Sequence, residues 1–331
     1  MDKNILQIEG LVTEFSTSEG KVTAVNNIDL NIKKGKIMGL VGESGCGKSV
    51  TSLSIMRLVP KPYGNISKGK ILFKDKNLLD LNEEDMRKVR GNDISMIFQE
   101  PMTALNPVFT IGYQIGEVLE LHLGLKGKEN LNRCIGLLEK VGIPRPEKVV
   151  HEYPHQLSGG MRQRVMIAMA LSCNPELLIA DEPTTALDVT IQAQVLEIMK
   201  GLSKELNTAI LLITHDLGVV AEMCHDVAVM YAGRIVEEGN VKDIFMNPMH
   251  YYTKGLMASR PNLVKKGERL KCIPGMVPSL HNMPKGCAFE PRCSNPMDIC
   301  KEKMPELIEY ENGHKVRCWA VEMEGNRNHG R

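Results

Sequence analysis

The sequence predicts an α/β fold in which an antiparallel β layer is combined with a parallel-sheet core, a helical subdomain and a loop-rich C-terminal extension. Segments 5–12 and 23–32 alternate apolar and polar residues as half-buried strands do. From 177 to 231 the pattern is strand, helix, strand, helix, strand, which favours parallel pairing through right-handed crossovers. After about residue 247 the apolar periodicity fades, and Pro, Gly and Cys become frequent. We therefore expect a main domain over 1–247 and an extension over 248–331.

The composition argues against a nucleic-acid-binding protein, a secreted protein and a membrane-spanning protein. The 331 residues carry a formal net charge of +1 and only 4% aromatic residues, which argues against a nucleic-acid partner. The N-terminus lacks the basic start and apolar core of a secretory signal, and no apolar stretch approaches the roughly 18 residues that span a bilayer. We expect a cytosolic protein. Nine cysteines are many for that compartment, where disulfides are rare, so some of them should bind metal.

Between the β layer and the core, two short strands are expected at 71–73 and 94–98, the second ending in Gln99. Apolar residues then recur at helical spacing from 111 to 142. The sequence therefore predicts a helical subdomain over about 101–172.

The segment GESGCGKS, from Gly42 to Ser49, fits a phosphate-binding loop of the pattern Gly, four free positions, Gly-Lys-Ser. A buried strand before it and an amphipathic helix after it supply the expected context. Lys48 would reach the β- and γ-phosphates of ATP, and the Ser49 hydroxyl would be a ligand of Mg²⁺. A Gly-rich turn without nucleotide is the alternative. The predicted loop residues are Gly42, Ser44, Gly45, Cys46, Gly47, Lys48, Ser49 and Val50.

The segment LLIADEP, from Leu177 to Pro183, predicts a strand that places two acids at its C-terminal end. This is the edge where ligands bind in open α/β sheets. Asp181 would hold Mg²⁺ through water, and Glu182 would polarise the attacking water. Helix capping by the acidic pair is the alternative, although it does not explain the buried strand before it.

Together with LSGGMRQR at 157–164, these motifs resemble the nucleotide-binding subunit of ATP-binding cassette (ABC) transporters. The resemblance implies that Ser158, Gly159 and Gly160 close over the γ-phosphate bound by the opposite protomer. Physically, a Ser and two glycines that open a helix present free N–H groups to an anion. A helix N-cap without ligand would look similar in sequence.

The same resemblance assigns roles to four further residues. It implies that Gln99 senses Mg²⁺ and the attacking water and begins the loop that meets the membrane subunits, and that His215 contacts the γ-phosphate. Asp188 matches the aspartate of the loop joining the protomers, with a plain N-cap as the rival interpretation. Phe15 is the candidate to stack on adenine, or else a core strand residue. A structural role is the alternative for both Gln99 and His215.

Cys46 departs from the family pattern, which more often has Ser or Ala at this position. It is small enough to fit, and a thiol here could make the site sensitive to oxidation.

The outer segments resemble the ATPases of dipeptide, oligopeptide and nickel importers: QEPMTALNP from Gln99, the arm at 110–142, and IPGMVPSL at 273–280. This implies two such ATPases, identical or related, at the cytoplasmic face of the membrane beneath two permease subunits, with an extracytoplasmic peptide-binding protein. ATP-driven import of peptides is the expected function. A nickel-importer ATPase, a soluble ABC ATPase acting on nucleic acid or the ribosome, and a non-enzymatic metal-sensing subunit are the alternatives, although the intact Glu182 and His215 argue against the last.

Four cysteines of the extension have the spacing C-x5-C-x6-C-x17-C, namely Cys287, Cys293, Cys300 and Cys318. Four thiolates suit zinc or an iron–sulfur cluster, and the paired C-x2-C of ordinary zinc ribbons is missing. The resemblance to peptide-importer ATPases implies a [4Fe–4S] cluster, with zinc or unliganded thiols as alternatives. Cys272 could substitute as a ligand. Buried single cysteines are expected at Cys134, Cys173 and Cys224.

Overall fold

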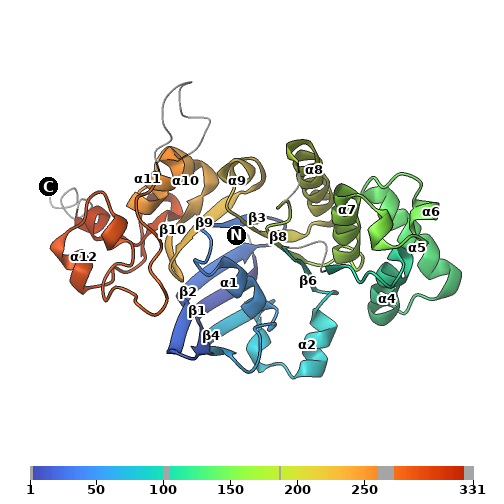
Figure 1. The fold of residues 1–331 in the computed structure, drawn as a ribbon, viewed down its shortest axis with the longest axis horizontal. Coiled ribbons are helices and arrows are strands. Elements are labelled where there is room, and N and C mark those ends of the chain that lie inside the picture. The colour runs from blue at the N-terminus through green and yellow to red at the C-terminus, as the bar shows by residue number, and fades with distance from the viewer. Residues whose placement is uncertain (1–2, 100–103, 186–187, 260–271, 324–331) are drawn as a thin grey trace. The chain divides into compact units, whose positions relative to one another are not determined.

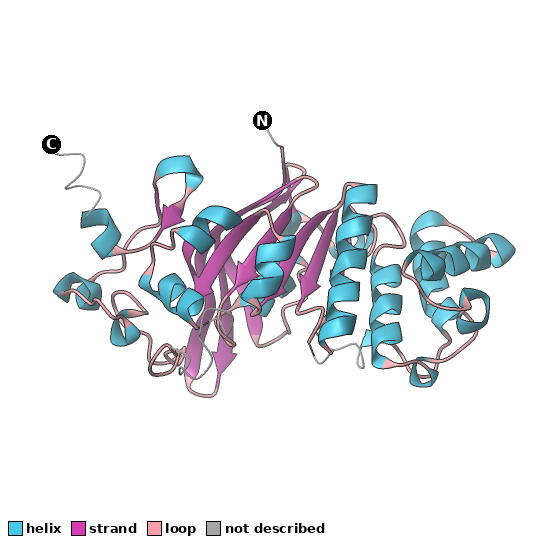
Figure 2. Ribbon diagram, turned by 90° about the horizontal axis from the view of Figure 1, so that it is seen from above, coloured by secondary structure: helices cyan, strands magenta, loops and turns pink. Residues whose placement is uncertain are grey.

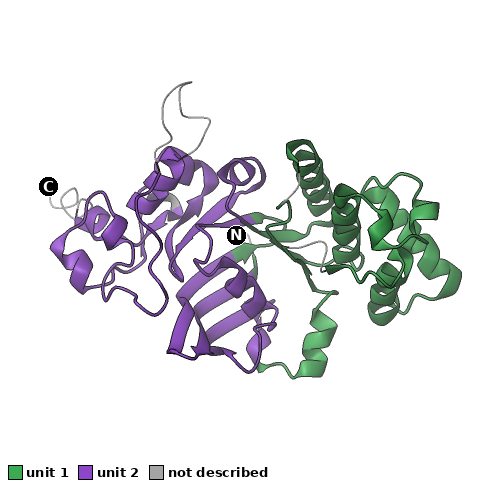
Figure 3. Ribbon diagram, viewed as in Figure 1, with its two compact units in different colours: residues 1–5, 32–37, 80–213 green, residues 6–31, 38–79, 214–331 purple. Residues whose placement is uncertain are grey.

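The structure is a computed structural model, and it describes residues 3–99, 104–185, 188–259 and 272–323. The chain divides into two compact units, coloured separately in Figure 3. Unit 1 comprises residues 1–5, 32–37 and 80–213, and unit 2 comprises residues 6–31, 38–79 and 214–331. Figure 1 labels the elements of both units. Each unit is described by itself below.

An antiparallel layer forms the first part of unit 2. Its strands are β1 (Asn4–Thr17), β2 (Gly20–Lys33), β4 (Gly64–Phe73) and β5 (Lys76–Asn77), in the order β2-β1-β4-β5. Inward-facing residues such as Leu6 and Ile8 are fully buried, as the period-2 alternation requires. The strands expected at 5–12 and 23–32 are confirmed, and both extend beyond their expected ends. β1 continues past residue 12 through a register shift between Val12 and Thr13.

A second group of strands in unit 2 carries the phosphate loop. It contains β3 (Ile37–Val41), β9 (Asp226–Tyr231), β10 (Arg234–Asn240), β12 (Lys315–Val316) and β11 (Ile308–Glu309), adjacent in that order. β3 and β9 pair in parallel, and every residue of β3 is buried, as expected for a parallel strand covered on both faces. Helices α1 (Lys48–Ile55), α9 (Leu217–Met223), α10 (Val241–Met246) and α11 (Tyr251–Ala258) belong to the same unit.

The C-terminal segment packs on these strands. β12 pairs antiparallel with β10. On β10, the fully buried Glu237 accepts hydrogen bonds from the backbone N–H groups of Met249 and His250, and its carboxylate lies 2.7 Å from His314 Nε2. The ring of Phe289 lies 5.2 Å from that of Tyr231. The described part of the extension therefore packs through a buried network on the strands of unit 2, to which it belongs. The domain boundary at 247 stays a prediction.

Unit 1 holds the remaining parallel strands. β6 (Ile94–Ile97), β7 (Leu177–Asp181) and β8 (Ala209–Thr214) lie in the order β8-β7-β6, with parallel pairing on both sides of β7. Helix α8 (Val189–Leu206) makes the crossover from β7 to β8. The strand and helix alternation expected over 177–231 is thereby confirmed.

Between β6 and β7 the described part of unit 1 is built mainly of helices, drawn in cyan in Figure 2. They are α4 (Ile111–Leu123), α5 (Gly127–Lys140), α6 (Pro146–Val149) and α7 (Gly159–Ala170), and the shorter α2 (Glu83–Val89) precedes β6. Ile111, Ile115 and Leu119 are fully buried on one face of α4, which confirms the helical spacing seen in the sequence. Among the described helices, none combines the length and the apolar character needed to cross a bilayer.

Candidate active site

The phosphate loop connects β3 to α1 in unit 2, and its glycines are required by close backbone contacts. At Gly42, where φ is +156°, a Cβ would lie 2.2 Å from the carbonyl oxygen of Met230. At Gly47, where φ is +108°, it would lie 2.6 Å from the carbonyl oxygen of Ala24. No side chain could be placed at either position without moving the backbone of a neighbouring strand or turn.

Lys48 is the first residue of α1 and is 5% exposed. Its Nζ donates hydrogen bonds to the carbonyl oxygens of Gly42 and Glu43, at 2.9 and 3.0 Å, so the ammonium group is held inside the curve of the loop. Ser44 and Gly45 are exposed at the outer side of this curve. A buried cation, glycine-rich backbone and a helix N-terminus together fit a polyphosphate.

Cys46 is 1% exposed, and burial raises the pKa of its thiol although Lys48 acts in the opposite direction. The neutral thiol is therefore the favoured form, and thiols react as thiolates. The oxidation sensitivity suggested by the sequence is not supported by this environment.

Two further candidates lie in unit 2. Phe15 is half-buried and pairs across β1 and β4 with Gly64, where a Cβ would lie 2.9 Å from the Phe15 ring. His215 directly follows β8 and is exposed. The adenine contact of Phe15 and the phosphate contact of His215 stay predictions.

In unit 1 the two candidate acids occupy different environments. Asp181 ends β7 and is 3% exposed. Glu182 adopts a left-handed backbone conformation, with φ of +47°, and its N–H donates to the carbonyl oxygen of Ile213 at 2.9 Å. A glutamate in this conformation is strained, and such strain concentrates at functional sites. The turn therefore directs the Glu182 side chain away from the path of the strand.

The carboxylate of Glu182 is oriented by two neutral donors. Its Oε2 accepts hydrogen bonds from Nε2 of Gln99 and from Oγ1 of Thr185, both at 3.0 Å. The structure thus brings together two residues, Gln99 and Glu182, that lie 83 positions apart. Thr185 was not among the candidate residues. Its position three residues after Glu182 could have suggested a local hydrogen bond from its hydroxyl to the Glu182 carboxylate.

The LSGGMRQR segment at 157–164 begins helix α7. Ser158 is the N-cap, and its side chain accepts a hydrogen bond from the N–H of Met161 at 3.3 Å. Apart from its chain neighbours and the backbone of its own helix, no described heavy atom lies within 4 Å of a Cβ built at Gly159. A Cβ built at Gly160 would lie 2.9 Å from Ile191 of α8. A side chain at Gly160 would clash with α8, so a glycine is needed there for the packing of the two helices. At Gly159 the backbone at the start of α7 is not covered by described side chains.

Two other contacts complete this part of unit 1. The buried side chain of Gln163 donates a hydrogen bond to the carbonyl oxygen of Pro183, which ties α7 to the turn that carries Glu182. Asp188 is the N-cap of α8 and accepts from the N–H of Ile191 at 3.0 Å. The capping interpretation of Asp188 is confirmed, and its role between protomers stays a prediction.

The four cysteines of the extension line one small cavity, together with residues that include Phe289 and Trp319. Burial, with a smaller contribution from the nearby Cys300, Cys318 and Cys293, raises the pKa of Cys287 to about 12. Among the described residues, however, no group of three or more His, Cys, Asp or Glu side chains converges as single-ion ligands do. Cys134, Cys173 and Cys224 are buried, as expected, and Cys272 is exposed.

Comparison with known proteins gives the family. Residues 25–185 match the family described as "ABC transporter", and residues 236–300 match "Oligopeptide/dipeptide transporter, C-terminal region". The chain is 54% identical over 321 residues to the oligopeptide transport ATP-binding protein AppD of Bacillus subtilis (strain 168), covering 97% of this chain and 98% of that protein. The chain belongs to the ATP-binding subunits of ABC transporters of the oligopeptide/dipeptide family. This ABC ATPase is also 50% identical to the dipeptide transport ATP-binding protein DppD of the same organism, over 96% of this chain and 95% of that one.

A solved structure supports the assignment to the ABC ATPases. The ATP-binding cassette MJ0796, described as a dimer in a post-hydrolysis state with ADP and Pi, aligns with a TM-score of 0.64 and 26% identity over 71% of this chain and 98% of that chain. ATP with Mg²⁺ is the expected cofactor pair of an ABC ATPase, and the phosphate loop fits the nucleotide. The aligned share is consistent with an additional C-terminal region in the present ABC ATPase, where its second family match lies.

Proposed function

We propose that this ABC ATPase hydrolyses ATP to drive the import of di- or oligopeptides through a membrane transporter. The observation that carries the proposal is similarity along nearly the whole chain, including the C-terminal region, to proteins named for oligopeptide and dipeptide transport. Nickel import is the second candidate, because the sequence motifs alone resemble those ATPases as well. Peptide is preferred because both the C-terminal family match and the relatives carry that name.

Hydrolysis proceeds by in-line attack of water on the γ-phosphoryl group, with no covalent intermediate. Lys48 would bind the β- and γ-phosphates, while Ser49 and Asp181 would hold Mg²⁺, which would neutralise negative charge on the phosphate oxygens. Glu182 polarises the attacking water. Its Oε2 is already oriented by hydrogen bonds from Gln99 and Thr185, which fix the direction of the carboxylate.

A second ATPase subunit completes each site. Ser158 and Gly159 contribute N–H groups and helix-dipole charge to the γ-phosphate bound by that subunit. The open position at Gly159 supports this role, because backbone there is accessible to a ligand of another chain. Asp188 lies in the segment that contacts the partner, and His215 contacts the γ-phosphate.

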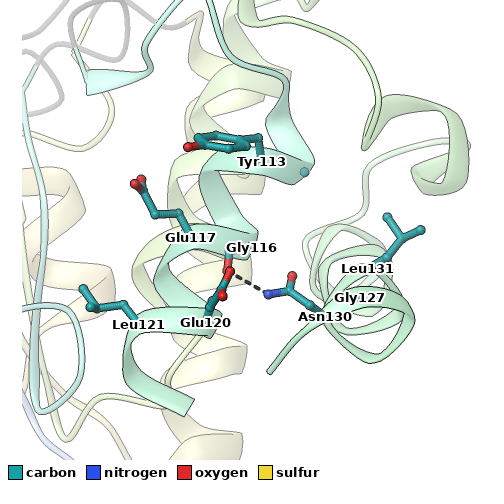
Figure 4. Close-up of a pocket in the computed structure, with 9 residues that line it drawn as sticks. Tyr113, Gly116, Glu117, Glu120, Leu121, Gly127, Asn130 and Leu131 are labelled. Atoms are coloured by element: carbon teal, nitrogen blue, oxygen red, sulfur yellow. Dashed lines mark hydrogen bonds between the residues drawn. The ribbon is translucent and has the colours of Figure 1, made fainter. Parts of the chain in front are cut away.

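Two permease subunits dock on the helical segment at the cytoplasmic face of the membrane. A pocket between α4 and α5, shown in Figure 4, is lined by Tyr113, Leu121 and Asn130 among others. Leu121 is 74% exposed and Tyr113 is 52% exposed. Exposed apolar side chains beside a pocket are typical of protein docking surfaces. An extracytoplasmic binding protein would deliver peptide to the permeases.

Transport in reconstituted vesicles tests the proposal. The full chain, assembled with its permeases and binding protein, should take up labelled dipeptide or tetrapeptide in an ATP-dependent manner. Tyr113→Asp and Leu121→Asp should abolish uptake while the isolated subunit still binds ATP, whereas Lys148→Glu on the exposed side of α6 should retain uptake. Uptake of nickel without uptake of peptide would replace the peptide assignment by the second candidate.

The cysteines of the extension hold a [4Fe–4S] cluster. The support is their common cavity and the raised pKa of Cys287, which makes a thiolate there costly unless a cation accompanies it. Each iron of a cluster takes one thiolate, so four cysteines that line one cavity match the number of ligands that a [4Fe–4S] cluster needs. Four thiolates also suit a single zinc ion, which stays the alternative.

Anaerobic purification with metal and sulfide analysis tests the cluster. Iron with sulfide and a broad visible absorption band are expected, and Cys300→Ser should lose both. Cys272→Ser, an exposed cysteine, is the matched control and should retain them. Colourless protein that contains zinc would make the extension a structural clip and leave the ATPase assignment intact.

A further inference from the structure

One residue of the C-terminal extension binds directly to the phosphate loop. The guanidinium of Arg292 makes a bidentate ion pair with Glu43, with Nη1 to Oε2 at 2.6 Å and Nη2 to Oε1 at 2.9 Å. The Arg292 side chain is 4% exposed and that of Glu43 is 32% exposed. Glu43 is the second residue of GESGCGKS, so the extension contacts the nucleotide site through a charge in the loop itself.

Arg292 is held in place by contacts with Pro274, Tyr231 and Phe289, none of which has an assigned part in hydrolysis. Its Nε donates to the carbonyl oxygen of Pro274 at 2.9 Å, within the IPG sequence. Its guanidinium carbon lies 5.8 Å from the ring centroid of Tyr231 and 6.0 Å from that of Phe289. An arginine fixed by a carbonyl and two aromatic rings is pre-organised for a planar, bidentate partner.

The backbone of Glu43 is held by hydrogen bonds at both its N–H and its carbonyl group. Its backbone N–H donates to Oη of Tyr252 at 2.8 Å, and its carbonyl oxygen accepts from Nζ of Lys48 at 3.0 Å. A carboxylate in this loop adds negative charge where a polyphosphate must bind, and at partly buried sites such repulsion is only weakly screened. An adjacent guanidinium removes most of that repulsion.

We propose that Arg292 is a positioning residue of the nucleotide site, which neutralises Glu43 and fixes the phosphate loop, so that the C-terminal extension sets the affinity for the nucleotide polyphosphate. The proposal rests on the ATPase assignment and not on the identity of the transported substrate. It explains why the IPG and FEPR segments, at 273–275 and 289–292, converge on one arginine. It also predicts that the effect of Arg292 depends on the charge of the ligand.

Binding of ATP, ADP and adenosine to the full-length chain, in competition with a fluorescent nucleotide, tests this dependence. Arg292→Ala should weaken ATP about tenfold, ADP less, and adenosine less than about twofold, because only phosphates experience the uncompensated carboxylate. Adding Glu43→Gln to this variant should restore ATP affinity to within about threefold of wild type.

Three further measurements decide between an electrostatic role and simple structural support. Arg292→Lys retains the charge and should lose less affinity than Arg292→Ala. Lys303→Ala, an exposed cation of the same extension, should change nothing. Should Arg292→Ala not fold, Glu43→Gln alone remains informative, because it should bind ATP at least as tightly as wild type. Equal losses for ATP and adenosine, a double variant no better than Arg292→Ala, or weaker ATP binding by Glu43→Gln would each overturn the proposal.

Discussion

Two glutamates, one in each unit, show how the same side chain is prepared for different tasks. Glu182 is oriented by the amide of Gln99 and the hydroxyl of Thr185, both neutral donors. Glu43 is paired with the guanidinium of Arg292. Neutral donors fix a carboxylate and leave its charge available to polarise water, whereas a guanidinium cancels the charge. From this comparison we predict that Glu182 performs chemistry and that Glu43 belongs to the frame of the phosphate loop.

Glu182→Gln should have the largest effect. Turnover should fall by about 10²–10⁴-fold, because the amide cannot accept the proton of the attacking water. ATP binding should persist, and size-exclusion chromatography with ATP should show an accumulated dimer. Phosphate release and nucleotide affinity are the measurements.

Glu43→Gln is the matched control for this variant, since it makes the same chemical change in the other unit. It should retain most of the turnover. The comparison fails if the two variants lose activity equally, or if Glu182→Gln hydrolyses ATP at the normal rate.

Removing the donors of Glu182 should have a smaller effect. Gln99→Ala should lower turnover about tenfold at nearly unchanged ATP affinity, because the carboxylate stays in place and loses one of the hydrogen bonds that orient it. Thr185→Val should act in the same direction and less strongly, since the amide remains. Steady-state kinetics of the two variants provide the check, and a change confined to nucleotide affinity would show that the donors serve binding instead.

A third carboxylate, Asp188, has a capping role that can be measured separately. Asp188→Ala should destabilise the chain by about 1 kcal/mol, because the N–H of Ile191 loses its acceptor. Urea unfolding measures this change, and Asp188→Ser should restore most of it because serine also caps helices. A stability unchanged by Asp188→Ala would remove the capping role.

The nucleotide motifs and the order of strands and helices could be predicted because they are encoded locally. GESGCGKS needs only adjacent residues to form a loop, and the spacing of Ile111, Ile115 and Leu119 defines a helix face without outside information. Glu182 and Gln99 could be paired only through resemblance to a family. Their hydrogen bond spans 83 positions, and no periodicity in the sequence relates them.

The contact of Arg292 with Glu43 could not be predicted, for a related reason. The two residues are separated by 249 positions, and the Pro, Gly and Cys content of the extension indicated loops without indicating what they cover. β12 could not be predicted either, because a strand of two residues is too short to show an alternation of apolar and polar residues. Short strands and buried ion pairs depend on tertiary context more than on local pattern.

The smallest effect expected concerns Cys46, which shares the phosphate loop with Glu43. Its Sγ lies 3.8 Å from Nζ of Lys48, yet burial raises its pKa above the ordinary thiol value, so the neutral form persists through and above neutral pH. Alkylation at pH 7.5, followed by mass spectrometry, should therefore modify the exposed Cys272 readily and Cys46 only slowly. The rate at Cys46 should rise with pH as the thiolate forms. Equal rates at the two cysteines would show that the Lys48 ammonium outweighs burial, and that the neutral thiol is not the favoured form of Cys46.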